Sequence, residues 1–162
     1  MGGGILPVAV NEGQLFFLFG EEYDEHKWCD FGGGAKPGES LLQNVIRESY
    51  EELDGFFGSP TDYRQLIKTN LLIKLSIETY TSFIVQVPYD KNLPFYFNNH
   101  HRFIKARLPH LEGKNGLYEK KQMKWMTIAD IIQHRGQFRH YYKAMLDLLI
   151  QHEQVILSAA TI

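Results

Sequence analysis

The sequence has few of the features that mark specialised protein classes. Its single cysteine, Cys29, excludes a disulfide scaffold and favours a reducing, cytoplasmic compartment. The formal net charge is only −2, so the broad basic surface of non-specific nucleic-acid binders is missing. The apolar runs, such as Ile5 to Val10, are far shorter than the roughly 20 residues that span a bilayer, and no basic residue precedes Lys27 to start a signal peptide. We therefore expect an intracellular protein without membrane contacts.

What remains is the composition of an ordinary globular chain. Hydrophobic residues make up 44% and charged residues 22% of the 162 positions, so the chain is able to bury a core without disulfides or metals as staples. No internal repeat or low-complexity tract divides it, and we predict one domain over residues 1–162.

The order of apolar and β-branched segments predicts an α/β fold. Residues 5–10 and 15–22 form a predicted hairpin, and a glycine-rich loop up to residue 38 follows it. The other predicted elements are strands at 71–79, 81–89 and 122–126, a short helix at 98–106 within an irregular segment from 90 to 116, a short helix from 127 and a long one at 137–157. Strands mixed with flanking helices imply an α/β/α sandwich, with a mixed β-sheet covered on both faces.

One further helix carries the informative residues. Ser40 and Gln43 have the spacing of a capping box, and an apolar stripe predicts a helix from about Leu41 to Leu53. Gly55 is placed to end this helix in a left-handed conformation, since it has no Cβ to clash there.

Three glutamates lie on one side of this helix. Glu48, Glu51 and Glu52 fall within about 100° of its surface. Like charges at these spacings cost about 0.2–0.5 kcal/mol each, and acids in the last turns oppose the helix dipole by about 0.3–1 kcal/mol each. A divalent cation removes both penalties, and oxygen ligands without a cysteine or histidine cluster suit Mg²⁺ or Mn²⁺. A solvated acidic face is the alternative that the spacing alone leaves open.

The residues around the helix form a longer pattern. Its fixed positions are Gly33, Glu39, Arg47, Glu48, Glu51 and Glu52. This pattern resembles the Nudix box, G-x5-E-x7-R-E-U-x-E-E-x-G-U, and six fixed positions coincide by chance in on the order of one in 10⁵ chains of this length. Ser49 departs from the box because an apolar residue is usual there, and we expect it to weaken helix packing slightly. Asp54 stands in place of the late glycine, and we expect either a left-handed Asp54 or a helix that ends one residue later.

The resemblance implies a Nudix-type hydrolase that cleaves a phosphoanhydride bond in a nucleoside diphosphate linked to another moiety, with Mg²⁺ or Mn²⁺ as cofactor. By the resemblance, Glu48, Glu52 and the main-chain carbonyl of Gly32 are metal ligands. Glu51 is a further metal ligand or the base that activates water, two roles that compete because a metal-bound carboxylate is a poor base. Arg47 orients a glutamate, so the catalytic candidates are Glu48, Glu51 and Arg47.

Residues outside the helix complete the expected site. Glu119 resembles a later family position that supplies an extra metal ligand or base, and Glu39 is expected to support the loop through hydrogen bonds. Lys36 and Arg102 are candidate phosphate contacts, against the alternative of solvated loop cations. The paired His100-His101 is expected at the surface or in a substrate loop, since it lacks the spacing of a zinc site.

The substrate and the partners are less defined by the sequence. We expect a small nucleotide-type substrate and do not favour capped RNA, because the chain has little basic character for so anionic a partner. The oligomeric state stays open, with a homodimer among the alternatives. Two other functions also remain: a non-catalytic Nudix module that binds a nucleotide or acts as a sensor, and an isoprenoid diphosphate isomerase, for which Cys29 offers little support.

Overall fold

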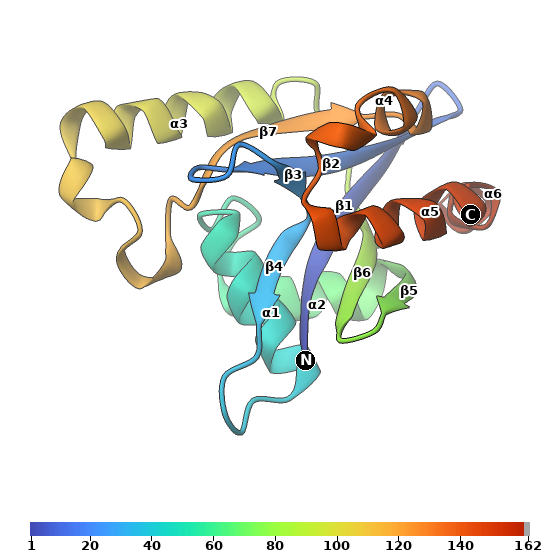
Figure 1. Ribbon diagram of the computed structural model, residues 1–162, viewed down its shortest axis with the longest axis horizontal. Coiled ribbons are helices and arrows are strands. Elements are labelled where there is room, and N and C mark those ends of the chain that lie inside the picture. The colour runs from blue at the N-terminus through green and yellow to red at the C-terminus, as the bar shows by residue number, and fades with distance from the viewer. Residues whose placement is uncertain (161–162) are drawn as a thin grey trace.

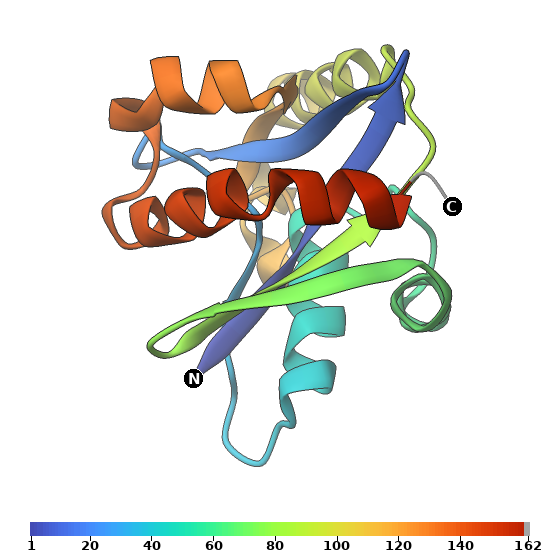
Figure 2. The same ribbon diagram turned by 90° about the vertical axis from the view of Figure 1, so that its right-hand side faces the viewer.

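The computed structural model describes residues 1–160 as a twisted β-sheet between two layers of helices (Figures 1 and 2). The strands are β1 (Gly2–Asn11), β2 (Gln14–Glu22), β3 (Trp28–Cys29), β4 (Phe31–Gly34), β5 (Leu71–Ile77), β6 (Tyr80–Gln86) and β7 (Lys120–Met126). The α-helices are α1 (Leu41–Glu52), α2 (Pro60–Asn70), α3 (Leu93–Arg107), α4 (Ile128–Gln133), α5 (Lys143–Gln151) and α6 (Glu153–Ala160). Short 3₁₀ helices lie at Pro109–Leu111, Lys114–Gly116, Arg135–Gln137 and His140–Tyr142.

Strand β1 is the centre of the sheet. It pairs antiparallel with β2 and β4 and parallel with β6, while β5 borders β6, and both β3 and β7 border β2. Gly4 faces Gly32 across the β1–β4 pair, where a Cβ on Gly32 would lie 2.3 Å from the Cα of Gly4. Only glycine permits so close an approach of two backbones. The pair therefore holds β4 and its glycines against the middle of the sheet.

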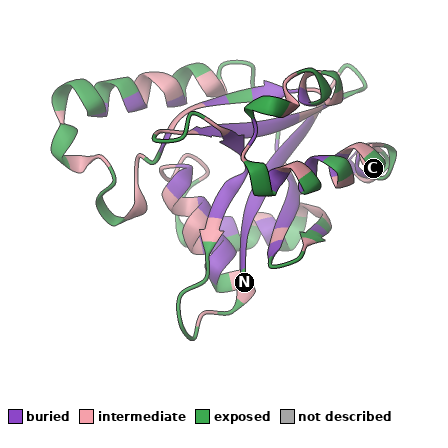
Figure 3. Cartoon of the chain, in the orientation of Figure 1, coloured by how far each residue is buried: buried purple, intermediate pink, exposed green. Residues whose placement is uncertain are grey.

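Hydrophobic side chains alternate between the two faces of the sheet. Along β1, Ile5 and Ala9 join the cluster under α1, α2 and α3, whereas Leu6 and Val8 join the cluster under α4, α5 and α6. Figure 3 shows the buried residues concentrated in the strands and on the inner sides of the helices. The predicted α/β/α sandwich is thus confirmed. No helix within residues 1–160 has the length and apolar character needed to cross a bilayer.

Some predicted boundaries were wrong. The loop expected to reach residue 38 contains β3 and β4, which are only two and four residues long and form because β2 and β1 offer partners. Helix α2 was not predicted, although Ser59 and Asp62 form a capping box around Pro60 at its first position.

Two helical predictions also need correction. Helix α3 starts at Leu93 and replaces most of the expected irregular segment, since Pro94 in its first turn favours a helix start. The expected long helix at 137–157 is divided into α5 and α6 at His152. The Nδ1 atom of His152 lies 2.8 Å from the carbonyl oxygen of Leu148, so the side chain engages a main-chain acceptor at this helix end.

Candidate active site

Helix α1 is fixed beside β4 by a buried serine. The hydroxyl of Ser49 accepts a hydrogen bond from the main-chain N–H of Ile5 at 3.1 Å and donates one to the carbonyl of Phe31 at 3.0 Å. Both main-chain groups are buried and need partners, which an apolar side chain would not supply. The expectation that Ser49 weakens the packing of the helix was therefore wrong.

The end of α1 is built around Asp54. This residue takes the left-handed conformation, with φ of +50°, and the amides of Asp54 and Gly55 bond the carbonyls of Glu51 and Tyr50 in a Schellman motif. Oδ1 of Asp54 accepts the main-chain N–H of Tyr118 at 2.7 Å, whereas Oδ2 is buried and has no hydrogen-bond partner among residues 1–160. Burial raises the pKa of Asp54 to about 7. The residue in the glycine position thus attaches the segment before β7 to the end of the helix.

Glu52 points inward from the last turn of α1. It is 4% exposed, and its Oε2 accepts the main-chain N–H of Gly32 at 2.7 Å and lies 3.3 Å from Nζ of Lys120. Nζ of Lys120 is closer to Glu22, at 2.6 Å from its Oε1. Two carboxylates therefore share one buried cation. Burial raises the pKa of Glu52. At Glu22 burial acts in the same direction, but Lys120, Arg139 and Cys29 together outweigh it and lower the pKa.

Arg47 gathers the remaining box glutamates. Its guanidinium lies 2.8 Å from Glu39, 2.6 Å from Glu48 and 3.2 Å from Glu51, and Glu39 also accepts the main-chain N–H of Lys36 at 2.9 Å. Its hydrogen bonds to Glu39 lower the pKa of that carboxyl to about 2. Partial burial nevertheless raises the pKa of Glu48, with Glu51 adding to the effect. Arg47 is thus shared among more negative charge than it neutralises.

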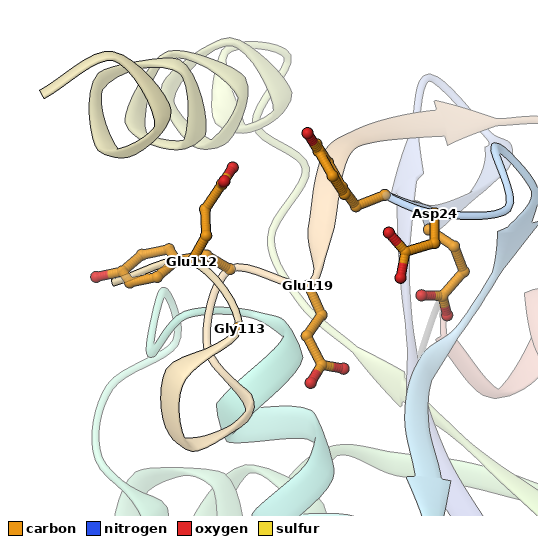
Figure 4. A pocket seen from close by; sticks show the side chains of 7 residues that line it. Asp24, Glu112, Gly113 and Glu119 are labelled. Atoms are coloured by element: carbon orange, nitrogen blue, oxygen red, sulfur yellow. The ribbon is translucent and has the colours of Figure 1, made fainter. Parts of the chain in front are cut away.

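Glu119 adds a carboxylate from outside α1 to Glu48, Glu51 and Glu52. It directly precedes β7, and Figure 4 shows its side chain pointing towards α1 while Glu112 points the opposite way. Partial burial raises the pKa of Glu119, as does repulsion from Glu22, Glu48 and Glu51. The structure therefore brings Glu119 to the box glutamates.

The residues present suit a hard divalent cation by their chemistry. Carboxylate oxygens outnumber the cations, and a Cβ on Gly33 would lie 2.6 Å from Oε2 of Glu48, so the glycine makes room for this carboxylate. Within residues 1–160, however, no three acidic, cysteine or histidine side chains are arranged to hold an ion. Glu48 and Glu51 instead pair with Arg47, and Glu52 pairs with Lys120.

A cavity of about 410 Å³ adjoins these carboxylates (Figure 4). It is lined by Glu22, Tyr23, Asp24, Glu112, Gly113, Tyr118 and Glu119, of which four are acidic. Its size lies within the range of roughly 300–1,000 Å³ typical of small-molecule sites. Glu22 and Glu119 line the cavity and also lie beside the glutamates of α1, so a molecule in the cavity would reach these glutamates.

Helix α3 supports the cavity wall. His101 is buried, contrary to expectation, and its Nε2 lies 3.2 Å from the carbonyl oxygen of Tyr118. Nζ of Lys105 lies 5.0 Å from the ring centre of Tyr23, a cation–π contact. His100 is half-buried against the ring of Tyr118. These contacts attach α3 to both sides of the cavity.

The two candidate phosphate contacts do not come together. Lys36 lies in the exposed β4–α1 loop and Arg102 is exposed on α3. Figures 1 and 2 place this loop and α3 at opposite ends of the molecule. Residues that the sequence reasoning missed are Glu22, Tyr23, Cys29, Tyr118 and Lys120.

Comparison with known proteins identifies the fold. No protein-family model and no curated protein matches the sequence. Among solved structures, a C. elegans Ap4A hydrolase in a binary complex has 17% identity and a TM-score of 0.61, covering 98% of this chain and 99% of that one. The M. smegmatis Nudix hydrolase RenU has 11% identity and a TM-score of 0.51, covering 96% and 86%.

A third solved structure is a Francisella tularensis bifunctional NMN adenylyltransferase/ADP ribose pyrophosphatase complexed with AMP and an Mn ion. It has 12% identity and a TM-score of 0.53, and the match covers 91% of this chain but 40% of that one. At these identities the likeness shows the fold, and the chain therefore has the Nudix fold.

Proposed function

We propose that this chain, on its Nudix fold, is a hydrolase that uses Mg²⁺ or Mn²⁺ to cleave a phosphoanhydride bond in a nucleoside diphosphate linked to another moiety. One observation carries the proposal: Glu48, Glu51, Glu52 and Glu119 gather beside the Gly32–Gly33 turn and next to a cavity of ligand size. An isolated acidic helix face would have neither the glycine turn nor the cavity.

The carboxylates would divide the work between binding and proton transfer. Glu48, Glu51 and Glu52, with the Gly32 carbonyl, would hold the cation, which when bound neutralises phosphate charge and lowers the pKa of water. Arg47, which already bonds both Glu48 and Glu51, would orient them. Partial burial and nearby negative charges raise the pKa of Glu119. A raised pKa suits a general base, so we assign this role to Glu119 rather than to a carboxylate that binds the metal ion.

The cavity also limits the substrate. Because four of its seven lining residues are acidic, phosphate groups would be repelled there unless a cation accompanies them. The rings of Tyr23 and Tyr118 give the same cavity apolar surface for a nucleoside. We therefore propose a nucleotide of moderate charge, such as a dinucleoside polyphosphate or ADP-ribose, in preference to capped RNA or diphosphoinositol phosphates.

Turnover assays test the proposal. Phosphate or nucleotide release would be measured for Ap4A, ADP-ribose, nucleoside triphosphates and capped RNA, with and without Mg²⁺ or Mn²⁺. Glu51→Gln and Glu52→Gln should each lower metal-dependent turnover by about 10²–10⁴-fold. Glu12→Gln, which changes an exposed glutamate in the β1–β2 turn, is the matched control. Full activity of both box variants would exclude the proposed mechanism.

A second function, nucleotide binding without hydrolysis, is supported by the ion pairs of the site. Arg47 pairs with Glu48 and Glu51, and Lys120 pairs with Glu52, so each of these carboxylates has a side-chain cation beside it without a metal ion. Calorimetry would then detect binding of a nucleotide from the same panel, while no metal yields turnover.

A further inference from the structure

Lys120 holds an unusual position for a lysine. It is 0% exposed, and its Nζ lies 2.6 Å from Oε1 of Glu22, 3.0 Å from Sγ of Cys29 and 3.3 Å from Oε2 of Glu52. The alkyl part of the side chain runs over Gly20, where a Cβ would lie 3.0 Å from Cδ of Lys120. The fold thus provides room for this side chain as well as partners for its charge.

The partners of Lys120 leave little space for another cation. A buried ammonium needs partners for its charge and its N–H groups, and here it donates hydrogen bonds to Glu22 and Cys29 and forms an ion pair with Glu52. Cys29 stays a thiol, because burial raises its pKa to about 12, and it donates to Oε1 of Glu22 at 3.5 Å. The charge of Glu22 also meets Arg139, whose Nη1 lies 3.3 Å away. The inner side of Glu52 is therefore already neutralised by side chains.

We propose that the ammonium of Lys120 takes the place of a divalent cation between Glu22 and Glu52, so that no metal ion bridges this inner pair. A divalent ion bridging Glu22 and Glu52 would lie beside a fixed positive charge with no water between them to screen the repulsion. Lys120 touches no solvent, so it is a positioning residue and does not contact substrate.

This inference rests on the metal site of the proposed function, but it concerns the number and place of the ions rather than turnover. The prediction is that removing the ammonium frees Glu22 and Glu52 to bind an ion of their own. A merely structural lysine would affect stability when removed, without adding a binding site.

The test counts bound Mn²⁺ by electron paramagnetic resonance. Lys120→Met, which keeps the length of the side chain without its charge, should bind one Mn²⁺ more per chain than the unaltered protein. Adding Glu22→Gln to this variant should return the count to the original value. The matched control is Lys121→Met, which loses a partly exposed lysine 3.1 Å from Glu21 and should leave the count unchanged. A folded Lys120→Met protein with an unchanged count would overturn the proposal.

A measurement on the unaltered protein covers the case in which Lys120→Met does not fold. In crystals soaked with Mn²⁺, no anomalous signal should lie between Glu22 and Glu52, and Lys120 should still be paired with both. A peak between these two carboxylates would overturn the proposal.

The two proposals can fail separately. An unaltered protein that neither binds Mn²⁺ nor hydrolyses the panel, with a Lys120→Met variant that binds one ion, refutes the hydrolase and supports the role of Lys120. Metal-dependent turnover, with equal numbers of bound Mn²⁺ in the unaltered protein and in Lys120→Met, supports the hydrolase and refutes the role of Lys120.

Discussion

Replacing Ser49 with alanine should destabilise the protein far more than an ordinary serine-to-alanine change. The substitution removes the hydroxyl that bonds both the N–H of Ile5 and the carbonyl of Phe31 in the buried space between α1 and the sheet. Each unsatisfied buried group costs about 1–3 kcal/mol, and the better helix propensity of alanine returns only about 0.5 kcal/mol. For the two groups together, we therefore expect the free energy of unfolding to fall by about 1.5–5.5 kcal/mol.

Urea unfolding followed by tryptophan fluorescence measures this loss. The matched control is Ser76→Ala on β5, where an exposed hydroxyl has one hydrogen bond, to Thr81, and the change should stay within about 0.5 kcal/mol. Because Ser49 holds α1 against β4, the 2.7 Å bond between Gly32 and Glu52 should loosen as well, and Mn²⁺ affinity should fall. A loss below about 0.5 kcal/mol for Ser49→Ala would refute the view that its hydroxyl fastens the helix.

Three other predictions concern the same region. Gly33→Ala should leave the free energy of unfolding nearly unchanged but reduce Mn²⁺ affinity in calorimetry, because the new methyl group would lie 2.6 Å from the flexible end of Glu48. The control Gly34→Ala, whose methyl group would meet no atom within 4 Å, should change neither quantity. Burial raises the pKa of Asp30 from 3.8 to about 6, so the folded protein binds the Asp30 proton more tightly than the unfolded chain does. This difference contributes about 3 kcal/mol of stability below pH 3.8, which is lost as the pH rises through 6. The stability advantage of the unaltered protein over Asp30→Asn, taken from urea unfolding, should therefore shrink between pH 4 and pH 7, and a constant difference would contradict the assignment. Asp54→Gly should speed amide hydrogen exchange at Tyr118 by removing its 2.7 Å acceptor, while the amides of α1 keep their protection.

The sequence predicts the elements that carry their own periodicity and caps. The boundaries of α1 follow from the capping box at Ser40 and Gln43 and from the apolar stripe, and the structure confirms them within one residue. Strands β3 and β4 give no such signal, because they are only two and four residues long and form through pairing with β2 and β1. Local sequence patterns thus predict α1, whereas the position of the glycine turn beside α1 depends on the pairing of β4 with β1 and cannot be predicted from them.

Lys120 shows why part of the site could not be predicted. Strict alternation back from the buried Met123 and Trp125 would turn Lys121 inward and Lys120 outward. The register of β7 against β2 shifts between Glu21 and Glu22, and the shift reverses the two lysines, so that Lys120 is buried and Lys121 is partly exposed. No local pattern in the sequence marks this irregularity.

The same irregularity decides how the candidate site is charged. With Lys120 outward, Glu52 would lose the ammonium that now lies 3.3 Å from its Oε2, and a carboxylate this deeply buried needs a cation or a proton. The shifted register instead delivers an ammonium to Glu52 and sends Glu119, one residue earlier, to the cavity wall. One register shift therefore supplies both the cation that neutralises the inner carboxylates and the carboxylate that faces the substrate cavity.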